Sequence, residues 1–241
     1  AVKVVFNNQE RLENLAGRLA QQLEADSLSL LNNFRDSVFL ETHGFTPKTA
    51  LAMYLPNSYE VFWNTTPKKF RNRMLKEYKR FWNSQRLEQA ERIGLTPEEV
   101  ISLAAIVQKE TVQVEERTKI AGVYLNRLRK RMRLEADPTV IYALKEKHQN
   151  FDTIIRRVLR KDLKIKSPYN TYKNKGVPPG PITMPDINAI DAVLQADSHK
   201  YLYFVANPKQ PGYHTFATTY IQHLRNSRAY HRWINSQKLY R

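Results

Sequence analysis

Apolar residues recur along most of this chain at intervals of three and four, the spacing of one buried helical face. The clearest stripe begins with Leu12, Leu15 and Leu19, after a capping asparagine at Asn7 or Asn8. Apolar periodicity of this kind predicts helices over residues 8–23, 27–40, 67–92, 97–110, 115–131, 138–147, 154–160, 185–197 and 219–240. The chain is therefore expected to be mostly helical.

Strand patterns are few and short. β-Branched and aromatic residues fill 2–6 and 201–206, and residues 213–216 form a plausible hairpin partner for the second run. Residues 50–62 mix strand-like alternation with a turn at Pro56. These patterns predict an α+β fold, in which a mostly helical domain with a small antiparallel sheet follows an N-terminal strand–helix–helix segment.

Two local signals set boundaries in the middle of the chain. Thr96, Pro97 and Glu99 form a capping box with proline at the first helical position, so a helix begins there. Residues 167–185 contain five prolines and two glycines, too many for regular secondary structure. Because tyrosine and aliphatic side chains recur among them, we expect a rigid, ordered loop.

The charge balance is strongly basic. The 241 residues carry a formal net charge of +16, with basic residues concentrated in 117–133 and 156–175. Such a charge favours an acidic partner, and nucleic acid, an anionic membrane surface or an acidic cell-wall polymer would each fit. A solvated surface that only maintains solubility is the alternative.

Several classes of chemistry are excluded. The chain has no cysteine, which excludes disulfides and thiolate nucleophiles. It also lacks phosphate-loop, dinucleotide and zinc-protease motifs, and its six histidines are scattered, so we expect no cofactor and no metal site. No apolar run reaches the about 18–20 residues of a membrane span. Because residue 1 is Ala rather than Met, we interpret the chain as a processed or trimmed product whose parent can carry an anchor.

The remaining candidate chemistry belongs to carboxylates. Glu110 ends an apolar helical stretch and, at about 100° per residue, falls between the directions of Leu103 and Ile106. A carboxyl group beside apolar side chains has a raised pKa and can act as a general acid near neutral pH. The alternative is an exposed glutamate that marks the end of a helix. Asp137 is the other conspicuous acid, with capping of the next helix as its alternative role.

Seven segments, taken in order, resemble the YceG-like (MltG) endolytic murein transglycosylases. The first, residues 103–111 (LAAIVQKET), resembles the family signature that contains its catalytic glutamate. The others are residues 123–128, 132–142, 167–172, 176–182, 201–205 and 212–216, with a looser match at 55–59. The resemblance extends over about residues 50–241.

The resemblance implies an enzyme that cuts peptidoglycan strands internally. Such enzymes cleave the β-1,4 bond between N-acetylmuramic acid (MurNAc) and N-acetylglucosamine (GlcNAc) without water and leave 1,6-anhydroMurNAc ends. One carboxyl group protonates the leaving oxygen and then accepts the proton of the attacking 6-hydroxyl. Glu110 falls on the position of the family's catalytic glutamate. Gln108 stands where the family commonly has another glutamate, so no second acid is present at that position.

The matched segments also supply predicted substrate-binding residues. They are Gln108, Asn126, Arg127, Asp137, Thr139, Tyr142, Tyr169, Asn170, Thr171, Tyr172, Pro179, Gly180 and His214. We expect the loop from Tyr169 to Tyr172, with Pro179 and Gly180, to offer polar donors and tyrosine faces to sugar rings. On this interpretation, Asn170→Ala weakens turnover and leaves the melting temperature nearly unchanged. In the alternative, the tyrosines pack in the core and the prolines stiffen the connection.

The resemblance also implies an organisation and a location. Residues 1–60 are expected to form a strand and helix segment that is a remnant of, or adjacent to, a LysM-like subdomain, and residues 61–241 the YceG-like catalytic domain. The parent protein is expected to cross the inner, or cytoplasmic, membrane once through an N-terminal helix absent here, with the catalytic domain on the periplasmic (extracytoplasmic) side. Expected partners are peptidoglycan glycan strands and peptidoglycan synthases, with a monomeric protein and no nucleic acid.

Two other classes of function remain open at this point. A non-catalytic scaffold that binds the cell wall would share the overall pattern, but it would not need an acid on an apolar helix edge. A basic nucleic-acid-binding module would explain the net charge, although no recognised motif supports it.

Overall fold

A computed structural model of the chain describes residues 1–236. The elements, in chain order, are β1 (Val2–Phe6), α1 (Leu12–Ala20), α2 (Ser27–Phe34), α3 (Ser37–Thr42), η1 (Ala50–Met53), β2 (Asn57–Val61), α4 (Pro67–Phe81), α5 (Ser84–Ile93), α6 (Pro97–Glu110), η2 (Val114–Glu116), α7 (Arg117–Arg129), α8 (Asp137–His148), η3 (Asp162–Lys164), α9 (Ile187–Leu194), β3 (Tyr203–Ala206), β4 (His214–Ala217) and α10 (Tyr220–Ser236). Helices predominate, and the strands form two small antiparallel sheets, which confirms the predicted α+β class.

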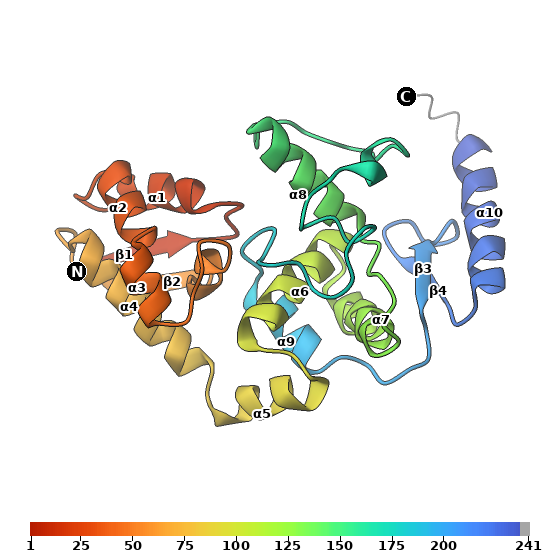
Figure 1. The fold of residues 1–241 in the computed structure, drawn as a ribbon, viewed down its shortest axis with the longest axis horizontal. Coiled ribbons are helices and arrows are strands. Elements are labelled where there is room, and N and C mark those ends of the chain that lie inside the picture. Colours follow the sequence, from red (N-terminus) through yellow and green to blue (C-terminus); the bar gives the residue numbers. More distant parts are fainter. Residues whose placement is uncertain (237–241) are drawn as a thin grey trace.

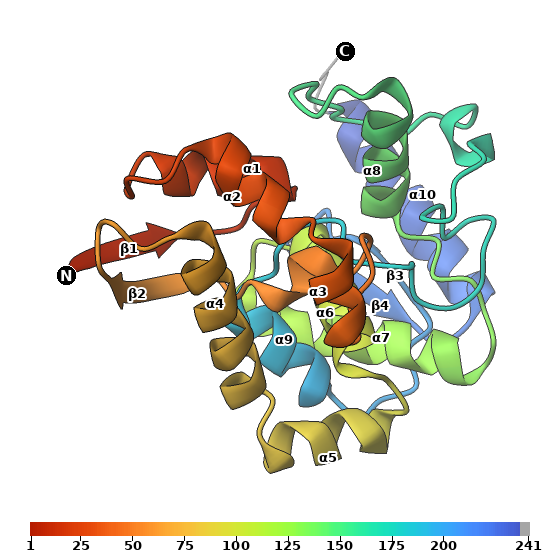
Figure 2. The same cartoon turned by 60° about the vertical axis from the view of Figure 1, so that its left-hand side comes forward.

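The N-terminal elements lie at one end of the molecule, where β1 pairs with β2 in antiparallel register (Figure 1). Val4 lies opposite Tyr59 in this pair, and the Phe6 and Tyr59 rings stack with centroids 5.5 Å apart. Both strands alternate between buried and exposed positions, so one face of the ribbon contributes to the core while the other faces solvent. Figure 2 shows the two strands side by side, with α4 beside them. The predicted strand at 2–6 is confirmed, and the strand predicted within 50–62 is β2.

Helix α6 occupies the centre of the molecule and packs against α7, α8 and α9. Its N-terminus has the predicted capping box, in which the Thr96 and Glu99 side chains each bond to the other residue's backbone N–H. Every residue from 100 to 107 is buried, including Ser102, whose hydroxyl donates to a backbone carbonyl of the same helix. The rigid core around α6 therefore fixes the direction in which its last residue, Glu110, points.

The C-terminal elements form the opposite end of the molecule. Strands β3 and β4 pair as the predicted antiparallel hairpin, with Val205 opposite Thr215, and α10 packs on both strands. The helix predicted over 219–240 is confirmed as far as Ser236, and residues 237–240 lie outside the described part of the chain.

Two predicted helices are each divided in the structure. The 27–40 helix is interrupted before Asp36, whose carboxylate accepts from the backbone N–H three residues later and so begins α3. The 67–92 helix ends at Phe81, and the side chain of Asn83 caps α5 in the same way. In both places a local side-chain cap competes with continuation of the helix, and the apolar period does not report it.

Two further element predictions are wrong. Neither Asn7 nor Asn8 caps a helix, because α1 begins later, at Leu12. The Asn8 amide instead donates to Met184 and Asp186. Residues 154–160 are irregular, and only the short η3 follows them. Ile154 is 79% exposed, so this stretch lacks the buried apolar face that would stabilise a short helix.

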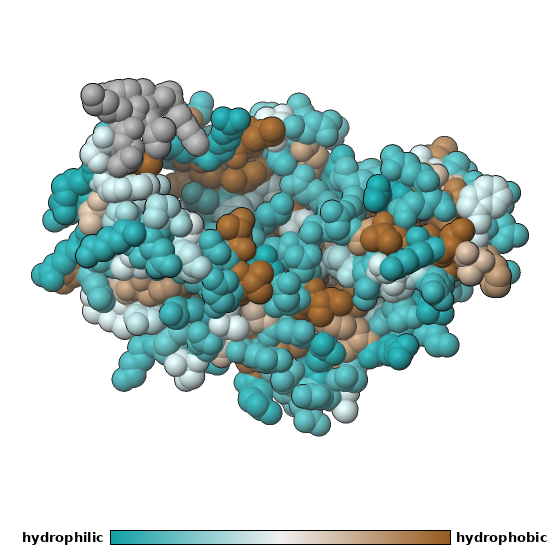
Figure 3. Space-filling view, turned by 180° about the vertical axis from the view of Figure 1, so that it is seen from behind, coloured by the Kyte–Doolittle hydropathy of each residue, from teal (hydrophilic) through white to brown (hydrophobic). Residues whose placement is uncertain are grey.

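The surface is mostly hydrophilic on the face in Figure 3, where apolar residues form small separate groups. Among residues 1–236, no helix combines the length and hydrophobicity needed to cross a membrane. The predicted division of the chain at residue 60 stays a prediction.

Candidate active site

A pocket of about 280 Å³ lies between the helical centre of the molecule and its C-terminal end. Its walls come from α6, α7, the segment before α8, the proline-rich loop, β3 and α10. The lining residues are Glu110, Tyr124, Arg127, Leu134, Glu135, Asp137, Tyr172, Phe204 and His223. Four of the residues predicted from the sequence are therefore brought together in one pocket: Glu110, Arg127, Asp137 and Tyr172.

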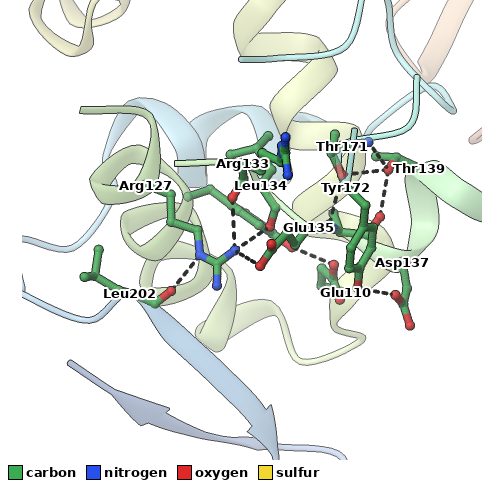
Figure 4. Close-up of polar contacts among 12 residues, drawn as sticks. Glu110, Arg127, Arg133, Leu134, Glu135, Asp137, Thr139, Thr171, Tyr172 and Leu202 are labelled. Carbon is green, nitrogen blue, oxygen red and sulfur yellow. Dashed lines mark hydrogen bonds and ion pairs between the residues drawn. The ribbon is translucent and has the colours of Figure 1, made fainter. Parts of the chain in front are cut away.

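Glu110 lies partly buried at the C-terminus of α6 (Figure 4). One carboxyl oxygen, Oε1, accepts a hydrogen bond of 2.6 Å from the hydroxyl of Tyr124 on α7. Burial raises the pKa of Glu110 to about 7, and the nearby negative charge of Asp137 acts in the same direction. The Tyr124 hydrogen bond and the positive charge of Arg127 oppose this rise without cancelling it. Glu110 can therefore hold or release a proton near neutral pH.

Arg127 is a buried anchor for one wall of the pocket. Its Nε donates to the Leu202 carbonyl at 2.7 Å, and its Nη1 donates to the Arg133 and Leu134 carbonyls, each at 3.0 Å. Nη1 also pairs with the carboxylate of Glu135 at 3.1 Å (Figure 4). The backbone of Glu135 has a positive φ of 52°, a conformation that is costly for a residue with a side chain. The guanidinium thus ties the residue before β3 to a locally strained segment.

A second hydrogen-bonded group connects α8 to the proline-rich loop. The buried hydroxyls of Thr139 and Thr171 are 2.8 Å apart, and the Tyr172 hydroxyl donates to Asp137 Oδ1 at 2.7 Å. Burial, followed by the hydrogen bond to Asp137, raises the pKa of Tyr172. Asp137 does not cap α8, because the helix has no side-chain cap; its carboxylate is held toward the pocket instead. The capping role considered for Asp137 is therefore wrong.

Asn170 supports the loop from within. It is fully buried, and its Nδ2 donates to the Leu163 and Ile165 carbonyls at 3.1 and 2.8 Å. Its Oδ1 accepts from the backbone N–H of Tyr172 at 2.9 Å. With these bonds the amide supports the backbone of the loop and of the segment before it, and its predicted role in substrate binding stays a prediction.

We now expect Asn170→Ala to destabilise the protein, contrary to the nearly unchanged melting temperature expected from the sequence. The substitution leaves one buried carbonyl, one partly buried carbonyl and one N–H without their partners, so the free energy of unfolding should fall by about 2–3 kcal/mol. Urea unfolding measures this loss. The exposed Asn150→Ala variant is the matched control and should unfold like the wild type. Equal unfolding midpoints for the two variants would contradict this prediction.

The other predicted substrate-binding residues lie outside the pocket lining. Tyr142 and Tyr169 pack ring against ring with centroids 4.6 Å apart, as the core-packing alternative expects. A Cβ on Gly180 would lie 2.0 Å from the Lys48 carbonyl oxygen, so the loop at Pro179 and Gly180 closely approaches the N-terminal part of the chain.

Three polar predicted residues make hydrogen bonds within the protein, and two of them, Gln108 and Asn126, hold backbone groups in place. Gln108 accepts from the backbone N–H of Asp186 at 2.6 Å, next to the start of α9. Asn126 donates to two carbonyls in the segment before β3, and His214 contacts both carboxylate oxygens of Glu116. Their predicted roles in substrate binding remain untested.

Five lining residues were not among the predicted site residues: Tyr124, Leu134, Glu135, Phe204 and His223. Tyr124 lies on the buried face of α7 with Ile120 and Val123, so the apolar period of the helix predicted over 115–131 was the available signal. His223 comes from a helix far along the chain, and its sequence context gives no sign of a site. Within residues 1–236, no cluster of three or more His, Asp or Glu side chains could hold a metal ion.

Comparison with known proteins shows the family to which the chain belongs. The sequence matches the model of the YceG-like family over residues 1–229. The chain belongs to this family. The match extends the resemblance inferred from residues 50–241 to the N-terminal elements.

Individual relatives agree with this assignment. Over 138 residues, 57% of this chain and 35% of the relative, the chain is 41% identical to the endolytic murein transglycosylase of Bacillus subtilis (strain 168). Over 114 residues it is 38% identical to the protein of the same name from Streptococcus pneumoniae serotype 2, covering 47% of this chain and 20% of that protein. A crystal structure of a YceG-like protein from Listeria monocytogenes superimposes with a TM-score of 0.74 and 28% identity, covering 93% of this chain and 75% of that one. The matched part is thus a minority of the full length of the two named transglycosylases.

Proposed function

We propose that this protein is an endolytic peptidoglycan lytic transglycosylase that cleaves the MurNAc–GlcNAc β-1,4 bond within nascent glycan strands. The observation that carries the proposal is the position of Glu110 at the wall of a pocket, with a pKa raised to about 7 by burial. The names of the Bacillus and Streptococcus relatives support the same reaction. The enzyme class is accordingly a carbon–oxygen lyase that acts on a polysaccharide.

Glu110 is the best suited of the three pocket carboxylates to act as the acid. Glu135 is exposed and paired with the guanidinium of Arg127. Asp137 is exposed and accepts from Tyr172. Glu110 alone of the three is partly buried, so it is the carboxyl group that retains a proton near neutral pH.

The proposed reaction uses the Glu110 carboxyl group twice, first as an acid and then as a base. Glu110 protonates the glycosidic oxygen as the bond between it and the MurNAc anomeric carbon breaks, and the GlcNAc 4-hydroxyl leaves. The MurNAc 6-hydroxyl oxygen attacks the anomeric carbon and forms the 1,6-anhydro bond, and its proton passes to the Glu110 carboxylate. No water is consumed, and the acid is restored. Tyr124 holds one carboxyl oxygen, which leaves the other for proton transfer.

The cellular setting is part of the proposal. Glycan strands are the proposed substrate, and synthases that make nascent strands are the proposed partners because an internal cut of a new strand must occur where strands are produced. The parent protein is proposed to be held at the cytoplasmic (inner) membrane by a single N-terminal helix, with this domain on the extracytoplasmic side. The net charge of +16 would favour contact with stem-peptide carboxylates and anionic lipids.

Product analysis tests the proposed reaction. Purified sacculi digested with the protein should yield shorter strands that end in 1,6-anhydroMurNAc, identified by mass spectrometry after reduction with borohydride. Reducible MurNAc ends would instead indicate hydrolysis, in which a second carboxylate such as Asp137 activates water. Intact sacculi after prolonged digestion would contradict any cleavage function and favour a scaffold.

A further inference from the structure

The C-terminal helix α10 contributes one side chain, His223, to the lining of the pocket that contains Glu110. No role for this residue follows from the reaction as proposed above. Its ring is partly buried and stacks on Tyr203 of β3, with centroids 5.2 Å apart and planes 22° from parallel. The guanidinium carbon of Arg127 lies 5.1 Å from the centre of the same tyrosine ring. The orientation of the imidazole is thus fixed by packing.

Hydrogen bonding sets His223 apart from the other polar groups of the pocket. Tyr124 pairs with Glu110, Arg127 with Glu135, and Tyr172 with Asp137. By contrast, His223 Nδ1 is buried without a hydrogen-bond partner within the part of the chain that the structure describes. A buried polar atom without a partner is rare in native proteins, and here it restricts which of the two ring nitrogens can carry the proton. His223 lines the pocket, so the nitrogen that carries the proton is a candidate donor to a bound ligand.

The environment of His223 also determines its protonation. Burial lowers the pKa of the imidazole, the positive charge of Arg127 lowers it further, and Glu135 opposes both. The ring is therefore neutral at pH 7, with one proton on one of its two nitrogens. A proton on the buried Nδ1 would leave an N–H donor without an acceptor, which is costly. The favoured tautomer has the proton on Nε2.

We propose that His223 is a substrate-positioning residue whose Nε2–H donates a hydrogen bond to an acceptor oxygen of the bound aminosugar, such as an acetamido carbonyl. This inference rests on the proposed function, because it takes the ligand of the pocket to be a glycan strand. Helix α10 and the β3–β4 hairpin then supply the wall that holds the sugar, while α6 supplies the acid. The pocket is complete only when the C-terminal helix is docked.

Two substitutions at His223 separate hydrogen bonding from packing. His223→Phe keeps a flat ring on Tyr203 but has no donor, and kcat/KM on purified glycan strands should fall about 5- to 10-fold. His223→Gln places an amide donor near the position of Nε2 and should stay within about threefold of the wild type. His231→Phe makes the same change at an exposed position of the same helix and should have no effect. His223→Phe and His231→Phe should melt at the wild-type temperature, whereas His223→Gln should melt slightly lower because it loses the ring that stacks on Tyr203.

Strand binding by the non-cleaving Glu110→Gln protein, measured by calorimetry with and without His223→Phe, gives a readout independent of catalysis. Weaker binding by the double variant is the expected result. The inference is overturned if His223→Phe matches the wild type in kcat/KM and binding, or if His223→Gln loses as much as His223→Phe. If the wild-type protein neither binds nor cuts glycan strands, the proposed function fails first and the inference with it. If the wild type cuts strands and the Phe variant cuts them equally well, only the inference fails.

Discussion

Glu110→Gln is expected to reduce strand cleavage by at least about 100-fold while the protein keeps its fold. Glutamine has the shape of protonated glutamic acid, and its amide can still interact with the Tyr124 hydroxyl, which lies 2.6 Å from Oε1 in the wild type. The amide cannot transfer a proton to the glycosidic oxygen. Release of anhydromuropeptides from sacculi, measured by chromatography and mass spectrometry, gives the rate, and thermal unfolding checks the fold.

Matched controls come from the same pocket. Glu135→Gln and Asp137→Asn make the same chemical change at carboxylates that are exposed and paired with Arg127 and Tyr172. If Glu110 alone transfers the proton, these variants should lose less than about tenfold. A loss at Asp137 as large as the loss at Glu110 would refute the one-acid scheme and support two carboxylates.

The raised pKa of Glu110 adds a pH readout of the same assignment. Burial raises this pKa to about 7, so the proton-donating form predominates below pH 7 and declines above it. The value of kcat/KM should therefore fall tenfold per pH unit on the alkaline side. An alkaline limb that begins near pH 5 would mean that the carboxyl group is not desolvated in solution.

Local patterns in the sequence predicted much of the fold because the relevant physics lies within a few residues. The capping box at Thr96 and the apolar period of α6 fixed both the start of this helix and the direction of Glu110. Competition between nearby signals was harder to predict: Asn83 could continue a helix or cap a new one, and its side chain caps α5. At 154–160 the residues are helix-compatible, yet none of them is fully buried and only Val158 among them packs against the core.

The site was less predictable because its contacts join distant parts of the chain. Asp137 and Tyr172 are 35 positions apart, and no local rule indicates that they share a hydrogen bond. The sequence resemblance identified Asn170 as a residue of the site region, but only burial shows that its amide organises the loop. A family motif reports that a residue matters; whether it contacts substrate or holds backbone depends on tertiary packing.

Arg127→Met is expected to destabilise the protein and to reduce cleavage together. Methionine fills part of the volume, but it leaves the carbonyls of Leu202, Arg133 and Leu134 without the donors that lie 2.7–3.0 Å away in the wild type. Leu134 is almost fully buried, and a buried carbonyl without a donor is costly. The free energy of unfolding should therefore fall by about 2–4 kcal/mol. Urea unfolding measures this change.

The effect on activity follows from the same contacts. Without the guanidinium, the strained segment at Glu135 loses the contacts made through the Arg133 and Leu134 carbonyls and the Glu135 carboxylate. The wall between β3 and α8 can then relax away from Glu110. Loss of the positive charge should also raise the pKa of Glu110 and move the alkaline limb to higher pH, because Arg127 lowers that pKa in the wild type. Arg129→Met, on the exposed face of the same helix, is the control and should alter neither property. If Arg127→Met unfolds at the same urea concentration as the control and keeps the wild-type pH profile, Arg127 does not hold the pocket wall. The packing of β3 against α10 would then hold that wall without the guanidinium.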